Sequence, residues 1–277
     1  MVSTTNPLTR QQIIDTLHQA LRAIPAVHAT WLGGSDATGR TDGYSDVDCQ
    51  ALVDDEAVEA VFTAVAAALS ALSPIDRQYR IPEPTWHGHS QVFYRLKDAP
   101  PWLLVDLAIL KMSSSPANRF LEPERHGRQV VLFDDDDLVQ PAPFDRPAHE
   151  AALQARLVHL TARFDLFHVF VDKAIWRRDA ADAISTYHAV TMRSLVELLR
   201  MRYCPDRYDF GLRYLDRDLP PEVRRQVESL LFCGSFEELA EKQATAVALF
   251  QATLNDLRQA LSKRTAVAFS PSADLPA

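Results

Sequence analysis

Apolar residues recur with helical spacing near the N-terminus of the chain and with strand-like spacing soon afterwards. Thr9 is a good helix cap, and the apolar positions after it predict an amphipathic helix that ends before Pro25. A second, alanine-rich helix is predicted over 56–72. Short β-type runs lie at 27–32, 47–53, 91–96, 102–110 and 129–133. The stretch 75–90 contains prolines and aromatic residues and predicts no element. The first half is therefore expected to form a small sheet flanked by helices.

The pattern changes after a group of prolines at 141, 143 and 147, where we place a domain boundary. Beyond it, apolar residues recur at helical spacing over 148–175 and over 180–203, and two further helices follow. Long helices joined by short loops pack as an antiparallel bundle. The chain is therefore expected to be α+β. Its predicted parts are a sheet-containing domain at 1–143, a helical bundle domain at 144–268 and a flexible tail at 269–277.

A glycine turn followed by two spaced aspartates is the strongest chemical signal in the sequence. Gly33, Gly34 and Ser35 end one predicted strand, and ten residues later Asp46 and Asp48 open the next. Strand side chains alternate, so the two carboxylates face the same way. Carboxylates this close repel each other unless a cation lies between them, and such hard oxygen ligands favour Mg²⁺ or Mn²⁺. Because the backbone N–H groups of a glycine turn can bind phosphate, the pattern indicates nucleotide chemistry.

Asp106 is a lone carboxylate within the apolar run 103–109, where a charge needs a partner or a metal. The preceding β-type run and the run around Asp106 are joined by a proline turn, which predicts a hairpin. If the second strand of that hairpin lies beside the strand that opens with Asp46 and Asp48, Asp106 completes a cluster of three carboxylates. A buried structural carboxylate paired with an arginine is the alternative.

His87 and His89 have a spacing that suits a metal site on a strand. No third metal-binding residue lies nearby in the sequence, so we favour the interpretation that the two histidines form a turn or surface pair.

Composition narrows the class of protein further. The chain has 277 residues and a formal net charge of −8, which argues against binding nucleic acid by bulk electrostatics. Its three cysteines are widely spaced without a C-x-x-C pair, which indicates a reducing compartment and excludes a disulfide framework. No signal peptide is recognised and no apolar run approaches the roughly 18 residues needed to span a bilayer. A cytoplasmic protein without membrane or nucleic-acid partners is expected.

The glycine turn and the aspartates match a known pattern. Leu32-Gly33-Gly34-Ser35, ten residues, and then Asp46-Val47-Asp48-Cys49 resemble the hG[GS]…Dh[DE]h signature of the polymerase-beta-like nucleotidyltransferases. Asp106 is similar to the third carboxylate of that superfamily. A small mixed-sheet catalytic domain followed by a helical domain resembles the aminoglycoside nucleotidyltransferases, particularly the streptomycin/spectinomycin adenylyltransferases.

The resemblance implies specific roles for the candidate residues. Asp46, Asp48 and Asp106 are expected to hold one or two Mg²⁺ ions on the triphosphate of ATP, and Asp106 to accept the proton of the acceptor hydroxyl. The residues expected to bind the nucleotide are Gly33, Gly34, Ser35, Ser45 and, from the helical domain, Lys173. For Lys173, a surface salt bridge is the alternative.

The implied reaction is transfer of AMP from ATP onto a hydroxyl of a small acceptor such as an aminoglycoside-like antibiotic, which would give a role in antibiotic resistance. An acidic protein suits a polycationic acceptor. One alternative keeps the chemistry but uses a protein or RNA acceptor, as in antitoxin-like relatives. Another is a non-enzymatic regulator that binds nucleotide.

Overall fold

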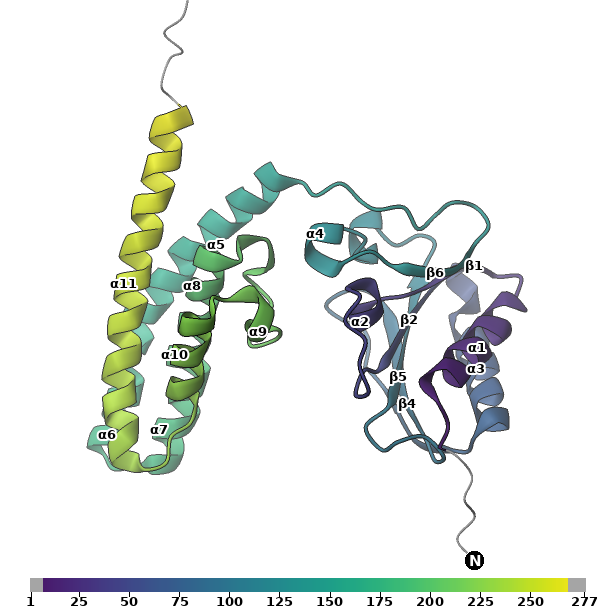
Figure 1. The fold of residues 1–277 in the computed structure, drawn as a ribbon, viewed down its shortest axis with the longest axis horizontal. Helices are drawn as coiled ribbons and strands as arrows, with labels where there is room; N and C mark the ends of the chain where they lie inside the picture. The colour runs from purple at the N-terminus through teal and green to yellow at the C-terminus, as the bar shows by residue number, and fades with distance from the viewer. Residues whose placement is uncertain (1–6, 269–277) are drawn as a thin grey trace, which may run out of the picture. The chain divides into compact units, whose positions relative to one another are not determined.

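The computed structural model of the protein describes residues 7–268. The chain divides into two compact units, Met1–Phe144 and Asp145–Ala277 (Figure 1). The first unit combines a sheet with helices and the second is helical, so the α+β prediction is confirmed. The predicted tail at 269–277 lies outside the described residues. Within the described part of the chain, no helix is long and apolar enough to cross a membrane.

The first unit is built on a six-stranded sheet with the order β3-β4-β5-β2-β1-β6. The strands are β1 (Val27–Leu32), β2 (Val47–Val53), β3 (Ile75–Arg80), β4 (Ser90–Leu96), β5 (Leu104–Lys111) and β6 (Val130–Asp134). The two central strands, β2 and β5, are parallel, and the other neighbouring pairs are antiparallel. The predicted hairpin is confirmed as β4 and β5, and its second strand lies beside β2 as the three-carboxylate hypothesis requires.

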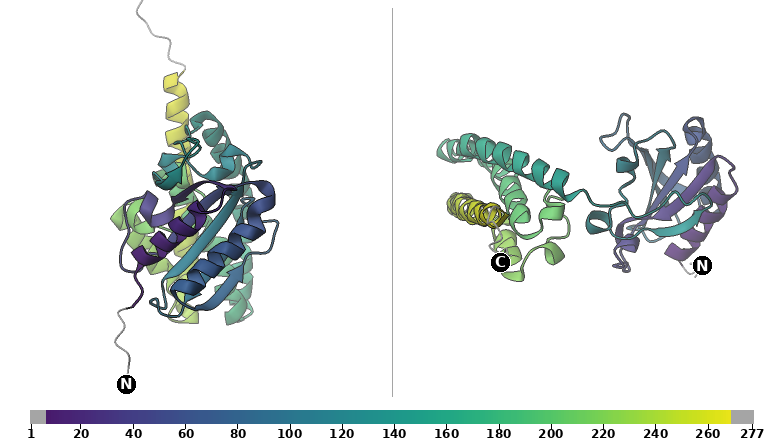
Figure 2. Two further views of the ribbon diagram at one scale, coloured as in Figure 1. Left: turned by 90° about the vertical axis from the view of Figure 1, so that its right-hand side faces the viewer. Right: turned by 90° about the horizontal axis from the view of Figure 1, so that it is seen from above.

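Helices α1 (Arg10–Arg22) and α3 (Val58–Leu72) cover one face of the sheet (Figures 1 and 2). Helix α1 begins at Thr9, whose side chain forms a capping box with Gln12. Alternate residues of the central strands point into this core, because strand side chains alternate between faces. They are Val47, Cys49, Ala51 and Val53 of β2, Val105, Leu107 and Ile109 of β5, and Val92, Tyr94 and Leu96 of β4.

The opposite face of the sheet carries a smaller apolar cluster. This cluster joins strand residues to the segments that flank β6; it consists of Ala29, Trp31, Leu52, Leu110, Leu121 and Val139. The short helices α2 (Gly34–Ala37) and α4 (Pro123–His126) belong to the connecting segments. Further along the same face, alternate positions of the strands carry polar side chains, and these form the candidate site.

Strand β3 was not predicted, because its sequence Ile-Asp-Arg-Gln-Tyr-Arg shows no alternation of apolar and polar residues. It lies at the edge of the sheet and most of its side chains are exposed. Arg80 at its end binds Glu59 and Glu83, with N–O distances of 2.6 and 2.9 Å. Charged side chains are common on edge strands because they discourage pairing with other chains.

The second unit contains α5 (Arg146–Phe167), α6 (Val169–Trp176), α7 (Ala180–Thr186), α8 (Arg193–Tyr203), α9 (Leu215–Asp218), α10 (Pro221–Leu231) and α11 (Phe236–Ala268). The single helix predicted over 148–175 is instead two helices that meet at His168. Between α7 and α8 the chain forms a π-helical segment, Tyr187–Met192. The wider turn directs Tyr187 to the carbonyl of Leu230 (2.9 Å) and Thr191 to Gln243 (2.8 Å), so buried polar groups are satisfied.

A buried ion pair holds the loop after α8. The side chains of Arg200 and Asp218 are both 0% exposed, and their N–O distance is 2.8 Å. Arg200 also donates hydrogen bonds to the carbonyls of Gly211 (2.6 Å), Arg207 (3.1 Å) and Arg213. One guanidinium therefore satisfies three carbonyls of a loop, 204–214, in which no residue is fully buried.

The substitution Asp218→Ala is expected to destabilise the protein by about 3–5 kcal/mol, because it leaves the Arg200 charge buried without its partner. Unfolding in urea, followed by circular dichroism, measures the change. Glu228→Ala is the control, since it removes half of the exposed Arg224–Glu228 pair and is expected to cost at most about 1 kcal/mol. Equal unfolding free energies for the two variants would contradict the prediction.

Candidate active site

The glycine turn after β1 packs closely against side chains of β2. The N–H of Gly33 donates to the carbonyl of Asp48 at 2.9 Å, which ties the turn to the strand. Gly34 has a φ of 53°, and a Cβ added there would overlap the Asp48 carboxylate. A Cβ on Gly33 would lie 2.9 Å from the side chain of Gln50. The two glycines therefore make room for side chains of β2, a requirement that sequence analysis did not foresee.

Asp48 and Asp106 are direct partners in the register of the parallel strands β2 and β5. Because paired residues of neighbouring strands face the same side, both carboxylates lie on the partly open face of the sheet. The negative charges of these carboxylates affect Cys49, whose side chain lies on the opposite face of the sheet. Burial raises the pKa of the Cys49 thiol to about 12, and the negative charges of Asp106 and Asp48 contribute to the shift. Cys49 is thus a neutral core residue and no candidate nucleophile.

Asp46 lies just before β2, and its carboxylate contacts the backbone. Its Oδ1 accepts a hydrogen bond from the N–H of Leu104, the first residue of β5, at 3.0 Å. In the part of the chain that the structure describes, no three His, Cys, Asp or Glu side chains are grouped as a metal site. Asp48 and Asp106 are thus paired by the strand register, whereas the Asp46 carboxylate contacts a backbone N–H. A metal-binding role for Asp46 stays a prediction.

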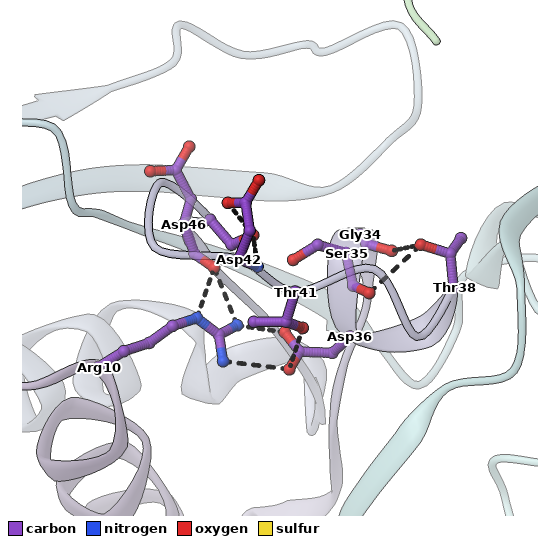
Figure 3. A network of polar contacts seen from close by, with 9 residues as sticks. Arg10, Gly34, Ser35, Asp36, Thr38, Thr41, Asp42 and Asp46 are labelled. Atoms are coloured by element: carbon purple, nitrogen blue, oxygen red, sulfur yellow. Dashed lines mark hydrogen bonds and ion pairs between the residues drawn. The ribbon is translucent and has the colours of Figure 1, made fainter. Parts of the chain in front are cut away.

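Arg10 and Asp36 are site residues that sequence analysis missed. Arg10, at the start of α1, donates from Nε and Nη2 to the carbonyl of Asp46 at 3.0 and 2.9 Å (Figure 3). It also binds both carboxylate oxygens of Asp36 in α2, one of them at 3.1 Å. These side chains are only 19% and 11% exposed. The arginine holds α2 and the start of β2 together, through contacts that span 26 and 36 residues and leave no local sequence signal.

Gln91 of β4 was also missed. Its Nε2 donates to both carboxylate oxygens of Asp106, at 2.6 and 2.8 Å. Gln91 pairs with Ala108 in the antiparallel register, two residues beyond Asp106 and on the same face. The hairpin was predicted from the sequence, but its register was not, so the contact could not be foreseen.

The two serines of the predicted site differ in their surroundings. The Oγ of Ser35 is buried without a hydrogen-bond partner in the described structure. The Oγ of Ser45 instead contacts Asp42, accepting from its N–H at 2.9 Å and donating to its carboxylate at 3.1 Å. A buried hydroxyl without a partner is costly, which makes Ser35 the better candidate for binding a ligand oxygen.

Lys173 and the histidine pair lie in different surroundings. Lys173 is exposed on α6, and its ammonium lies 5.2 Å from the centre of the Phe170 ring. Its contact with a triphosphate remains a prediction. His87 is half-buried, whereas His89 is buried and hydrogen-bonded to the carbonyl of Asn118 at 2.5 Å. The predicted turn is present at these residues, but the buried His89 rules out a surface pair.

The chemistry of the site suits a magnesium–triphosphate ligand. Asp48 and Asp106 supply hard carboxylate oxygens side by side, which are the ligands that Mg²⁺ prefers. The unpartnered hydroxyl of Ser35 adds a donor at the glycine turn. The binding of a metal and of a nucleotide at these residues stays a prediction.

Several solved structures resemble the chain, including the three that follow. An aminoglycoside 6-adenyltransferase from Bacillus subtilis is 14% identical, with 92% of each chain covered and a TM-score of 0.38. A spectinomycin adenyltransferase from Enterococcus faecialis, solved with ATP and spectinomycin, is 11% identical over 90% of this chain and 100% of its own, with a TM-score of 0.35. A nucleotidyltransferase-like protein from Exiguobacterium sibiricum is 13% identical over 92% of this chain and 80% of its own, with a TM-score of 0.35. No family model and no curated protein matches the chain.

Gly34→Ala is expected to destabilise the protein more than Gly39→Ala, by about 1–3 kcal/mol, since it adds a clash with Asp48 to the same backbone strain. Both glycines have positive φ, 53° and 64°, but nothing lies within 4 Å of a Cβ on Gly39. Unfolding of both variants in urea provides the comparison. Indistinguishable stabilities would show that the Asp48 carboxylate does not require a glycine beside it.

Proposed function

We propose that the protein is a metal-dependent nucleotidyltransferase that moves AMP from ATP onto a hydroxyl group of a small acceptor. The observation that carries the proposal is the direct pairing of Asp48 with Asp106 beside a glycine turn that packs against Asp48. Carboxylate oxygens are ligands that Mg²⁺ prefers, and the backbone N–H groups of a glycine turn can bind phosphate.

In this proposal Asp48 and Asp106, with Asp46, hold one or two Mg²⁺ ions. When bound, Mg²⁺ neutralises charge on the triphosphate and polarises the oxygens that attack and leave. The Oγ of Ser35 donates to a phosphate oxygen, which satisfies its buried hydroxyl. Lys173 of the helical unit is a proposed further contact to the triphosphate.

Asp106 is the proposed general base. The acceptor oxygen forms a bond to the α-phosphorus of ATP, the bond between that phosphorus and the bridging oxygen breaks, and pyrophosphate leaves with the electron pair. The proton of the acceptor hydroxyl passes to Asp106. The Nε2 of Gln91 donates to both oxygens of this carboxylate, which favours its ionised form.

The proposed acceptor is a polycationic small molecule such as an aminoglycoside-like antibiotic. The net charge of −8 supports a cationic acceptor, and it argues against an RNA acceptor, which would need a basic surface.

The test is incubation of the protein with Mg²⁺, each of the four nucleoside triphosphates and a panel of aminoglycosides, while pyrophosphate release is followed. Acceptor-dependent release with ATP is the expected result. Binding of ATP without release for any acceptor would overturn the transferase proposal and favour a nucleotide-binding regulator. Release that depends on an added protein or RNA would reassign the acceptor.

Asp48→Asn is expected to lower kcat by about 100-fold or more, because a neutral amide replaces a metal-binding charge worth several kcal/mol. Steady-state pyrophosphate release measures the effect, with circular dichroism to confirm the fold. Asp15→Asn is the matched control, since it makes the same change on the exposed side of α1 and is expected to leave kcat unchanged. Wild-type turnover by the Asp48 variant would refute the metal assignment.

Asp106→Asn is expected to lower kcat by about 10²–10⁴-fold, the usual range for loss of a general base. The dissociation constant for ATP, measured by calorimetry with Mg²⁺, is expected to change much less. An unchanged kcat would remove Asp106 from the proton transfer. An equal loss of ATP affinity would leave it a metal ligand alone.

A further inference from the structure

Two exposed aromatic side chains lie side by side on the loops that lead into the two central strands. Tyr44 precedes β2 and Trp102 precedes β5, and their ring centroids are 5.6 Å apart with the planes tilted by 47°. Tyr44 is 76% exposed and Trp102 is 51% exposed. A single exposed aromatic residue is normal, but a contacting pair leaves a larger apolar surface in water and marks a place where a ligand can bind.

Hydrogen bonds join the two loops that carry this aromatic pair. The indole Nε1 of Trp102 donates to the carbonyl of Gly43 at 3.1 Å. Two residues further along each loop, the N–H of Leu104 donates to the carboxylate of Asp46 at 3.0 Å. The rings are therefore presented from a connected backbone, so a ligand that contacts them does not have to order the loops first.

The aromatic pair lies at the edge of the sheet where the proposed active site begins. The parallel strands β2 and β5 both enter the sheet at this edge. Tyr44 lies four residues before Asp48, and Trp102 lies four residues before Asp106. Four residues of extended chain span at most about 14 Å between backbone positions. A molecule of a few rings that contacts the pair is therefore long enough to reach the two carboxylates.

The charges beside the rings favour a cation. The N–H of Tyr44 donates to the carboxylate of Asp42 at 2.8 Å, and Figure 3 shows this carboxylate pointing to the same side of the loop as that of Asp46. The segments 41–46 and 98–104, which contain the two rings, include no lysine or arginine; Arg40 and Lys97 immediately precede them. Aromatic faces also attract cations, because their π electrons carry negative charge. A phosphate would be repelled by both kinds of group.

We propose that Tyr44, Trp102 and Asp42 form a binding site for a cationic ring of the acceptor, such as an amino sugar. The aromatic faces contact the apolar face of that ring and attract its ammonium group, and Asp42 supplies the opposite charge. These residues select the acceptor and take no part in the transfer itself. The proposal rests on the proposed function, and it assigns to the acceptor residues that the metal and the triphosphate do not use.

The first test removes one aromatic face. Tyr44→Leu is expected to raise the KM for the acceptor about 3- to 30-fold and to leave the KM for ATP within about twofold of wild type. Tyr44→Phe, which keeps the ring, is expected to retain the wild-type KM for the acceptor. Tyr79→Leu makes the same change at another exposed tyrosine, on β3, and is the control.

Two outcomes of this test would overturn the proposal. One is an unchanged KM for the acceptor in Tyr44→Leu. The other is a raised KM for ATP with an unchanged KM for the acceptor, which would assign the rings to the nucleobase.

The second test removes the charge of Asp42 and keeps its hydrogen bond. Asp42→Asn retains an oxygen that accepts from the N–H of Tyr44, so the loop keeps its turn. The KM for the acceptor is expected to rise about 3- to 10-fold at low salt and to depend less on salt than in wild type, because salt screens the interaction that is lost. Asp15→Asn, on the exposed side of α1, is the control. Identical salt dependence in Asp42→Asn and wild type would contradict a contact between Asp42 and a cation.

The third test measures binding without turnover. The protein is titrated with each aminoglycoside of the panel in the presence of Mg²⁺ and a non-cleavable ATP analogue, and tryptophan fluorescence is followed. The fluorescence is expected to change on binding, to stop changing in Trp102→Phe and to keep changing in Trp86→Phe, the control at another exposed tryptophan. A change that persists in Trp102→Phe, or no binding by any of these cations, would overturn the proposed site.

The two proposals can fail separately. Binding that depends on Trp102 without pyrophosphate release would overturn the proposed transferase and leave the cation site. Acceptor-dependent release that is unaffected by Tyr44→Leu and Asp42→Asn would overturn the cation site and leave the transferase.

Discussion

The pairing of two carboxylates on neighbouring parallel strands is the constraint on which the first unit depends. Asp48 and Asp106 carry like charges at the same rung of β2 and β5, an arrangement that costs free energy. The cost is tolerated because the same two strands bury Cys49 and Leu107, the next residues along, in the core beneath α1 and α3. A slip of β5 by one residue would turn Leu107 out of the core and Asp106 into it, so the core itself maintains the pairing.

Around this pair, the open face of the sheet carries both an apolar cluster and polar networks. An apolar cluster that includes Trp31 covers part of this face. Two polar networks support the acidic residues from different elements. Arg10 holds the backbone of Asp46 against α2, and Gln91 holds the side chain of Asp106 from β4. Groups restrained in this way need little reorganisation when a ligand binds, which is the arrangement expected of a site that orients its substrate.

The second unit is stabilised on a different principle. It has its own apolar core, and the buried guanidinium of Arg200 organises a loop that contributes little to that core. Arg207 and Arg217 also contact Asp218, so loss of this one carboxylate would leave several positive charges without a counter-charge. The folds of the sheet-containing unit and of the helical unit do not specify an activity by themselves. The functional proposal therefore rests on Asp48, Asp106, Ser35 and the glycine turn.

Local pattern in the sequence determined the strands β1, β2, β4 and β5, the capped helix α1, the domain order and the candidate residues Gly34, Asp48 and Asp106. Each of these signals lies within a few consecutive residues. Only the tertiary structure decided the register that brings Asp48 to Asp106, the contacts of Arg10, Gln91 and Trp102, and the place of the polar edge strand β3. The physical reason is that pairing and hydrogen bonding between distant segments depend on which face of the sheet each side chain occupies and where each strand begins, and periodicity alone specifies neither.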